Sequence, residues 1–132
     1  MDWARAKPDA APIRFEVFVR EQRVPEEIEL DEMDERCVHA VAFLEGRPIG
    51  TGRLLPDGHI GRMAVLKPWR GSGVGGKLLA SLIDRARELR HEEVVLSAQV
   101  HAVPFYLRHG FRPEGPEYLE AGIPHQAMRL AL

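Results

Sequence analysis

The stretch RGSGVGGK, residues 70–77, is the most informative part of this chain. It places four glycines among the six residues 71–76, between a predicted strand over 59–66 and a predicted helix over 73–90. Glycine costs a helix up to ~1 kcal/mol relative to alanine, so a helix start that merely tolerates glycine is a poor explanation. Glycine does let a backbone approach a ligand closely, and N–H groups at a helix N-terminus attract anions. The stretch therefore predicts a loop that binds a phosphate-bearing ligand.

On both sides of this loop the hydrophobic pattern predicts a mixed sheet with helices packed on it. Apolar residues recur at every third or fourth position from Leu78 to Leu89, which is typical of an amphipathic helix. Turns at 45–48 and 56–58 predict three successive antiparallel strands. The apolar run Val94–Leu96 indicates a buried central strand. The predicted fold class is therefore α/β, as a mixed α+β sheet.

The predicted elements follow the order β-α-β-β-β-α-β-α-β-β. Strands are expected at 2–6, 37–44, 49–55, 59–66, 94–99, 111–112 and 126–132. Helices are expected from an N-cap at Asp9 to about Gln22, over 73–90, and over 102–109, where Gly110 ends the helix. We find no repeats or linkers and expect residues 1–132 to form one domain.

The composition excludes several classes of protein. The chain has 132 residues, 45% hydrophobic and 29% charged, as is usual for a globular domain. A net charge of −2 argues against nucleic acid as a partner. No apolar run approaches the ~20 residues of a membrane span, and the first ten residues lack a signal-peptide core. The single cysteine, Cys37, fits a reducing compartment, so we expect a cytoplasmic protein without a disulfide or a membrane partner.

An acidic run and two nucleotide motifs leave alternatives open. Seven acidic residues lie within 26–35, either as a solvated surface or as a wall that attracts a cationic ligand. The spacing from Gly71 to Gly76 matches the dinucleotide fingerprint, but the next strand ends in 97–99 (Ser-Ala-Gln) without the required acidic residue. It also matches a P-loop, but Leu78 stands where a magnesium-binding Ser or Thr is needed.

Four blocks in order along the chain carry a resemblance to a known family. They are VFVREQRVPEEIELDEMD at 17–34, GRMAVLKPWRGSGVG at 61–75, AQVHAVPFYLRHGF at 98–111 and AGIPHQAM at 121–128. Together they resemble the GNAT N-acetyltransferase superfamily, in particular its YjcF-like and ElaA-like acetyltransferases. The resemblance implies a GNAT-like fold with a central, mostly antiparallel sheet of six to seven strands and about four helices.

The resemblance implies acetyl-CoA as co-substrate. The backbone of 71–76 would hold the pyrophosphate, with Arg70 as a further phosphate contact. The backbone of 63–65 would pair with the pantetheine arm, and an N–H group there would stabilise the thioester oxyanion. The expected cofactor-binding residues are Met63, Ala64, Val65, Arg70, Gly71, Ser72, Gly73, Val74, Gly75 and Gly76.

The resemblance further implies direct transfer of the acetyl group to an amine. Tyr106 is the candidate general acid for the CoA thiolate; its alternative role is to pack a short helix onto the sheet. Candidates for a general base or for acceptor contacts are Glu29, His39 and His125. Cys37 is interpreted as a packing residue, and the remaining histidines lack metal-ligand spacing, so no metal is expected.

The sequence thus favours an acetyl-CoA-dependent N-acetyltransferase that acts on a small-molecule amine. The alternatives are a non-catalytic acyl-CoA-binding or regulatory module and a P-loop-type nucleotide binder. The C-terminal strand is a candidate contact for a homodimer.

Overall fold

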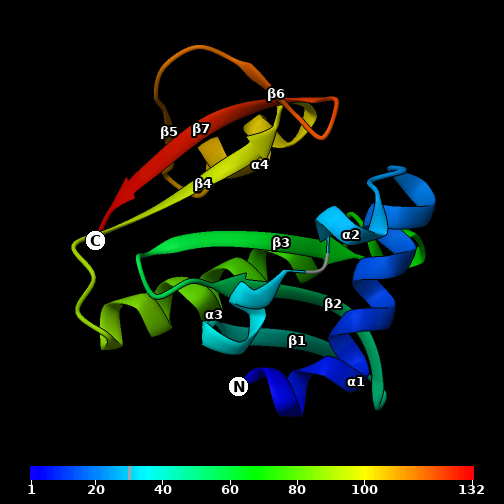
Figure 1. Cartoon of the computed structure of the whole chain (residues 1–132). Helices are drawn as coiled ribbons and strands as arrows, with labels where there is room; N and C mark the ends of the chain where they lie inside the picture. The colour runs from blue at the N-terminus through cyan, green and yellow to red at the C-terminus, as the bar shows by residue number, and fades with distance from the viewer. Residues whose placement is uncertain (30) are drawn as a thin grey trace.

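A seven-stranded mixed sheet forms the frame of the molecule in a computed structural model, which describes residues 1–29 and 31–132 (Figure 1). The strands are β1 (Val38–Leu44), β2 (Arg47–Leu54), β3 (His59–Val65), β4 (Glu93–Gln99), β5 (Arg112–Pro113), β6 (Tyr118–Glu120) and β7 (Ile123–Ala131). Their spatial order is β1-β2-β3-β4-β7-β5, and β6 also pairs with β7. The β3–β4 pair is parallel and the other pairs are antiparallel, which confirms the predicted sheet.

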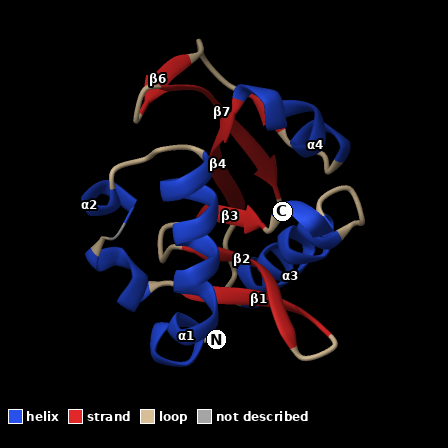
Figure 2. Ribbon diagram, turned by 90° about the vertical axis from the view of Figure 1, so that its right-hand side faces the viewer, coloured by secondary structure: helices blue, strands red, loops and turns tan. Residues whose placement is uncertain are grey.

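Helices cover both faces of this sheet. The α-helices are α1 (Trp3–Arg14), α2 (Glu26–Glu29), α3 (Val74–Glu88) and α4 (Val103–Arg108). Figure 2 shows α1 and α3 on opposite sides of β1–β3. A π-helical segment, η1 (Phe15–Glu21), continues α1, and shorter 3-10 turns are η2 (Glu32–Arg36), η3 (Lys67–Trp69) and η4 (Val100–Ala102). No helix in the described part of the chain is long and apolar enough to cross a membrane.

The main core lies between α3 and the sheet. The apolar side of α3 buries its leucines and Ile83 against β2, β3 and β4, as its three-and-four spacing predicts. Strand β4 contributes Val94 and Leu96, and β7 contributes Met128. Strand β7 lies inside the sheet, with β4 on one side and β5 and β6 on the other, so pairing already occupies both of its edges.

The N-terminal prediction is wrong. Residues 2–6 were expected as a strand, but they lie at the start of α1, whose N-cap is Asp2 and not Asp9. The Asp2 carboxylate accepts a hydrogen bond from the Arg5 backbone N–H at 3.0 Å, which satisfies a free donor of the first turn. Ala6, Ala10 and Ile13 then form a buried helical face, because residues three and four positions apart share one side of a helix.

The C-terminal region contains a strand that the pattern did not predict. Strand β6 and the first residues of β7 form a hairpin around Ala121 and Gly122, which have φ angles of 51° and 76°. Two successive positive φ angles are typical of a type I′ turn. Alanine seldom occupies such a position, so the turn has a weak sequence signal.

Candidate functional site

Strands β3 and β4 separate partway along the sheet, and we call the gap between their backbones the cleft. The two strands pair at His59 with Val95 and at Ile60 with Leu96, and beyond these positions they diverge (Figure 1). Strand β4 stays paired with β7 as far as Gln99. In the described part of the chain, the second half of β3 thus has no paired strand on its β4 side, which is the place expected for a pantetheine arm.

A β-bulge lies at the start of this cleft. In the pairing with β2, Arg53 opposes Gly61 and Thr51 opposes Ala64, so Arg62 and Met63 together oppose Gly52. Arg62 has a φ angle of 50°, in the left-handed region. A bulge bends its strand and increases the local twist, so it accounts for the departure of β3 from β4.

The glycine loop joins η3 to α3 at the end of the cleft. Gly71 and Gly73 have φ angles of 81° and 88°, and Gly73 is the N-cap of α3. A Cβ atom at either glycine would meet open space, so the backbone conformation and not crowding requires glycine here. No side chain caps the N–H groups of the first turn of α3. These free donors and the positive helix end fit a pyrophosphate.

Gly75 and Gly76 have a packing role that the sequence analysis did not assign. A Cβ atom at Gly75 would lie 3.5 Å from Phe105 Cζ, and one at Gly76 would lie 3.3 Å from His109 Cε1. Both neighbours belong to α4 or its C-terminal cap. These two glycines therefore let α3 approach α4 closely.

Arg70 ties the glycine loop to the rest of the chain. Its Nε donates a hydrogen bond to the Val65 carbonyl oxygen at 2.8 Å, and its Nη2 donates to Glu21 Oε1 at 2.8 Å. Ser72 Oγ donates to the Trp69 carbonyl oxygen at 2.5 Å within the same loop. The guanidinium thus joins the end of β3 to η1, and a phosphate contact for Arg70 stays a prediction.

Tyr106 lies on α4 with its ring in the main core, 8% exposed. The ring packs edge-on against Phe105 and Phe111, at centroid distances of 5.0 and 5.7 Å. Burial raises the pKa of the Tyr106 hydroxyl to about 12, so the phenol stays protonated at neutral pH. In the described part of the chain, desolvation by burial is the cause of this shift, and no hydrogen bond to the Tyr106 hydroxyl contributes to it.

The three candidate bases lie in different surroundings. His125 on β7 has its Nδ1 2.7 Å from the Ile123 carbonyl oxygen and its Nε2 3.4 Å from Glu120 Oε2. His39 on β1 is buried, which lowers its pKa, and its Nε2 donates to a backbone carbonyl at 2.8 Å. Glu29 is buried in ion pairs with arginines. None of these contacts is shared with Tyr106, so the structure does not bring a base and the acid into direct contact.

Part of the acidic run forms an ion-pair network that is buried except at Asp31 and Arg62, which are half-buried. Its members are the carboxylates of Glu29, Asp31 and Asp34 and the guanidinium groups of Arg14, Arg53 and Arg62. Hydrogen bonds from Arg53 lower the pKa of Asp31. Three positive charges balance three negative charges, so these carboxylates are neither a solvated surface nor free to attract a cationic ligand. Such pairing across distant elements has no signature in the sequence.

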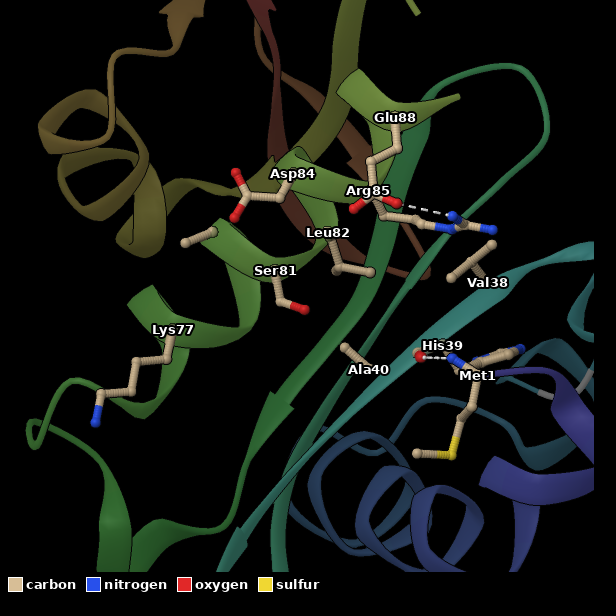
Figure 3. Close-up of a pocket in the computed structure, with 11 residues that line it drawn as sticks. Met1, Val38, His39, Ala40, Lys77, Ser81, Leu82, Asp84, Arg85 and Glu88 are labelled. Atoms are coloured by element: carbon tan, nitrogen blue, oxygen red, sulfur yellow. Dashed lines mark hydrogen bonds and ion pairs between the residues drawn. The ribbon is translucent and has the colours of Figure 1, made fainter. Parts of the chain in front are cut away.

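One surface cavity lies beside α3 and another beside η1. One, of about 540 Å³, lies between α3 and β1 and has Lys77, Asp84 and Glu88 of α3 on its wall (Figure 3). The other, of about 510 Å³, lies between η1 and η3 and includes Trp69. Neither includes residues 63–65 or 71–76, to which the sequence analysis assigns CoA binding. No group of three or more His, Cys, Asp or Glu in the described part of the chain is arranged to hold a metal ion.

Comparisons with known proteins identify the family. The model of the GNAT acetyltransferase domain matches residues 6–132. The uncharacterized N-acetyltransferase YjcF of Bacillus subtilis is 43% identical over 124 residues, which cover 91% of this chain and 89% of YjcF. An acyl-CoA N-acyltransferase from Pseudomonas aeruginosa is 35% identical, with a TM-score of 0.83 and coverage of 93% and 88% of the two chains. Escherichia coli ElaA is 29% identical, with a TM-score of 0.82 and coverage of 92% and 86%.

These matches agree with the resemblance of the four sequence blocks and with the observed sheet. They extend over nearly the whole chain, which excludes the P-loop alternative. The chain belongs to the GNAT acetyltransferase family and is an acyltransferase.

Proposed function

We propose that this protein transfers the acetyl group of acetyl-CoA directly to the amine of a small molecule, with both substrates bound at the cleft between β3 and β4. The observation that carries the proposal is the separation of these strands beside the uncapped N-terminus of α3. The separated part of β3 offers a strand edge to the amide groups of the pantetheine arm. The N-terminus of α3 offers N–H donors to the pyrophosphate.

Binding of acetyl-CoA would use backbone groups. The free N–H groups of 71–76 would hold the pyrophosphate, and 63–65 would pair with the pantetheine amides as an added strand. An N–H group of the bulged part of β3 would donate to the carbonyl oxygen of the thioester as negative charge develops on it. Such a donor is fixed in the sheet before the reaction and needs no reorganisation.

The transfer step would need two proton movements. The amine nitrogen forms a bond to the thioester carbon, and the carbon–sulfur bond breaks. The Tyr106 hydroxyl then donates its proton to the CoA sulfur, and the proton lost by the amine leaves through a base. A phenol whose pKa burial raises to about 12 is protonated at neutral pH, but it is a weaker acid than a thiol, so this role requires the hydroxyl to lie within hydrogen-bond reach of the sulfur.

Among the candidate bases, His125 has the most suitable hydrogen bonds. A carbonyl oxygen accepts and does not donate, so Nδ1 of the neutral ring carries the proton toward Ile123 and Nε2 keeps a lone pair. Glu120, 3.4 Å from Nε2, would stabilise the imidazolium that forms. His39 has its Nε2–H committed to a carbonyl, and Glu29 is committed to Arg14.

Direct transfer also agrees with the state of the cysteine. Cys37 is the single cysteine of the chain and is buried, and burial raises the pKa of its thiol to about 11. An acyl carrier needs an accessible thiolate, which Cys37 does not supply at neutral pH. Release of free CoA from acetyl-CoA, measured with a thiol reagent across a panel of amines, tests the proposal and identifies the acceptor.

A further inference from the structure

Arg62 has a strained backbone at the point where the cleft opens. It is the first of the two bulge residues opposite Gly52, and its φ angle is 50°. A non-glycine residue in the left-handed region is strained, and it persists there when surrounding contacts hold it. Gly61, immediately before it, would adopt this conformation without strain, so the position of the bulge needs a specific cause.

The Arg62 side chain is fixed to Glu29 and Asp31. Its Nε donates a hydrogen bond to the Glu29 carbonyl oxygen at 3.3 Å, and its Nη2 donates to Asp31 Oδ2 at 3.3 Å. Its Nε is also 3.9 Å from Glu29 Oε1. These contacts tie the bulge of β3 to a segment about thirty residues earlier in the chain.

The two residues that bind the Arg62 guanidinium, Glu29 and Asp31, are the anchor and are themselves held in place. Asp31 accepts two hydrogen bonds from the buried Arg53, at 2.8 and 2.9 Å. Glu29 accepts a hydrogen bond from Arg14 at 2.5 Å, with both side chains buried. The charge-assisted hydrogen bonds of the buried Arg14 and Arg53 resist displacement, so the network is a rigid support for the half-buried Arg62 guanidinium.

We propose that Arg62 is a positioning residue, whose anchored side chain keeps β3 bulged away from β4 and the cleft open for the pantetheine arm. Without the bulge, the register of Ile60 with Leu96 would continue along both strands and close the cleft with strand pairing. The inference rests on the proposed function, because it assumes that CoA occupies this cleft.

Three variants test this role through CoA affinity, measured by calorimetry without turnover. Arg62→Ala removes the anchor and keeps the strain, so CoA should bind at least about tenfold more weakly, as for loss of one charge-assisted hydrogen bond. Arg62→Gly also removes the anchor, but glycine adopts the bulge without strain, so its affinity should lie between that of Arg62→Ala and the wild type. Asp31→Asn weakens the anchor from the other side and should also lower the affinity.

The outcomes separate positioning from other roles. Equal losses in Arg62→Ala and Arg62→Gly would indicate direct contact of the guanidinium with CoA and would overturn the proposal. Wild-type CoA affinity in Arg62→Ala would also overturn the proposal. If Arg62→Ala does not fold, wild-type CoA affinity in Asp31→Asn would overturn it instead. A wild-type protein that binds CoA but releases none with any amine contradicts the transfer reaction alone, and one that does not bind CoA contradicts both proposals.

Discussion

The Arg14 guanidinium on α1 donates two hydrogen bonds to the Asp34 carboxylate, at 2.7 and 3.1 Å, and both side chains are almost fully buried. This bond joins the first helix to η2, twenty residues later, and belongs to the network that also holds Arg62. A buried ion pair adds little to the free energy of folding when compared with apolar residues in place of both partners. The loss of one partner, however, leaves a buried charge without compensation and destabilises the fold.

Arg14→Met should therefore destabilise the protein strongly. It leaves Glu29 and Asp34 without a cationic partner on α1, and removal of one partner from a buried pair costs about 3–5 kcal/mol. Urea unfolding measures this loss. The matched control is Arg85→Met, whose pair with Glu88 is on the surface, where such pairs contribute about 0–1 kcal/mol. Similar stabilities for the two variants would mean that the network does not support the fold.

Gly73→Val should abolish measurable CoA binding. Gly73 has a φ angle of 88°, which a β-branched residue does not adopt, so the loop and the first turn of α3 would rearrange. Gly46→Val is the control, because Gly46 has a φ angle of 79° in the β1–β2 hairpin, far along the chain from the loop. Calorimetry with CoA should show loss of binding in Gly73→Val alone. Unchanged affinity in a folded Gly73→Val protein would exclude the loop as the pyrophosphate site.

Tyr106→Phe should lower kcat and leave CoA affinity nearly unchanged. The substitution keeps the ring in the core and removes the hydroxyl, and a positioned general acid contributes about 10²- to 10⁴-fold to the rate. Tyr118→Phe is the control at the other tyrosine of the chain, where the lost hydroxyl bonds to Ser97. Full kcat in Tyr106→Phe, when chemistry limits the rate, would show that Tyr106 is a packing residue. The CoA thiolate would then leave without a proton from Tyr106.

Tyr106 also predicts a loss of stability at alkaline pH. Its pKa is raised from 10.0 in the unfolded chain to about 12 in the folded protein, so the folded state binds this proton more tightly. The resulting stabilisation is complete below pH 10 and disappears as the pH rises toward 12. It amounts to roughly 2–3 kcal/mol at 1.36 kcal/mol per pKa unit. The unfolding free energy of the wild type should fall relative to that of Tyr106→Phe across this range, and a constant difference between the two would contradict the burial of the hydroxyl.

Local signals predicted the parts of the fold that surround the glycine loop. The three-and-four spacing of α3, the turn at Glu45-Gly46 and the apolar run of β4 each specify one element without help from distant residues. The N-terminus failed because Asp2 and Asp9 are equally good caps in the sequence, and burial of Ala6 and Ala10 decides between them.

The site was less accessible to prediction than the fold. Gly71 and Gly73 have the positive φ angles that a glycine loop predicts. Gly75 and Gly76 cannot be told apart from them in the sequence, but they serve to pack α3 against α4 and its C-terminal cap. The Arg62 bulge depends on hydrogen bonds to a segment that folds against it from elsewhere in the chain. Contacts of this kind arise from tertiary structure, so residue type and spacing do not report them.

Initial velocities measured while acetyl-CoA and an accepted amine are both varied test the central claim most directly. Direct transfer in a ternary complex predicts that double-reciprocal lines intersect and that CoA is released only when the amine is present. Parallel lines, or a burst of CoA release without amine, are the kinetic signs of an acyl-enzyme and would contradict the account.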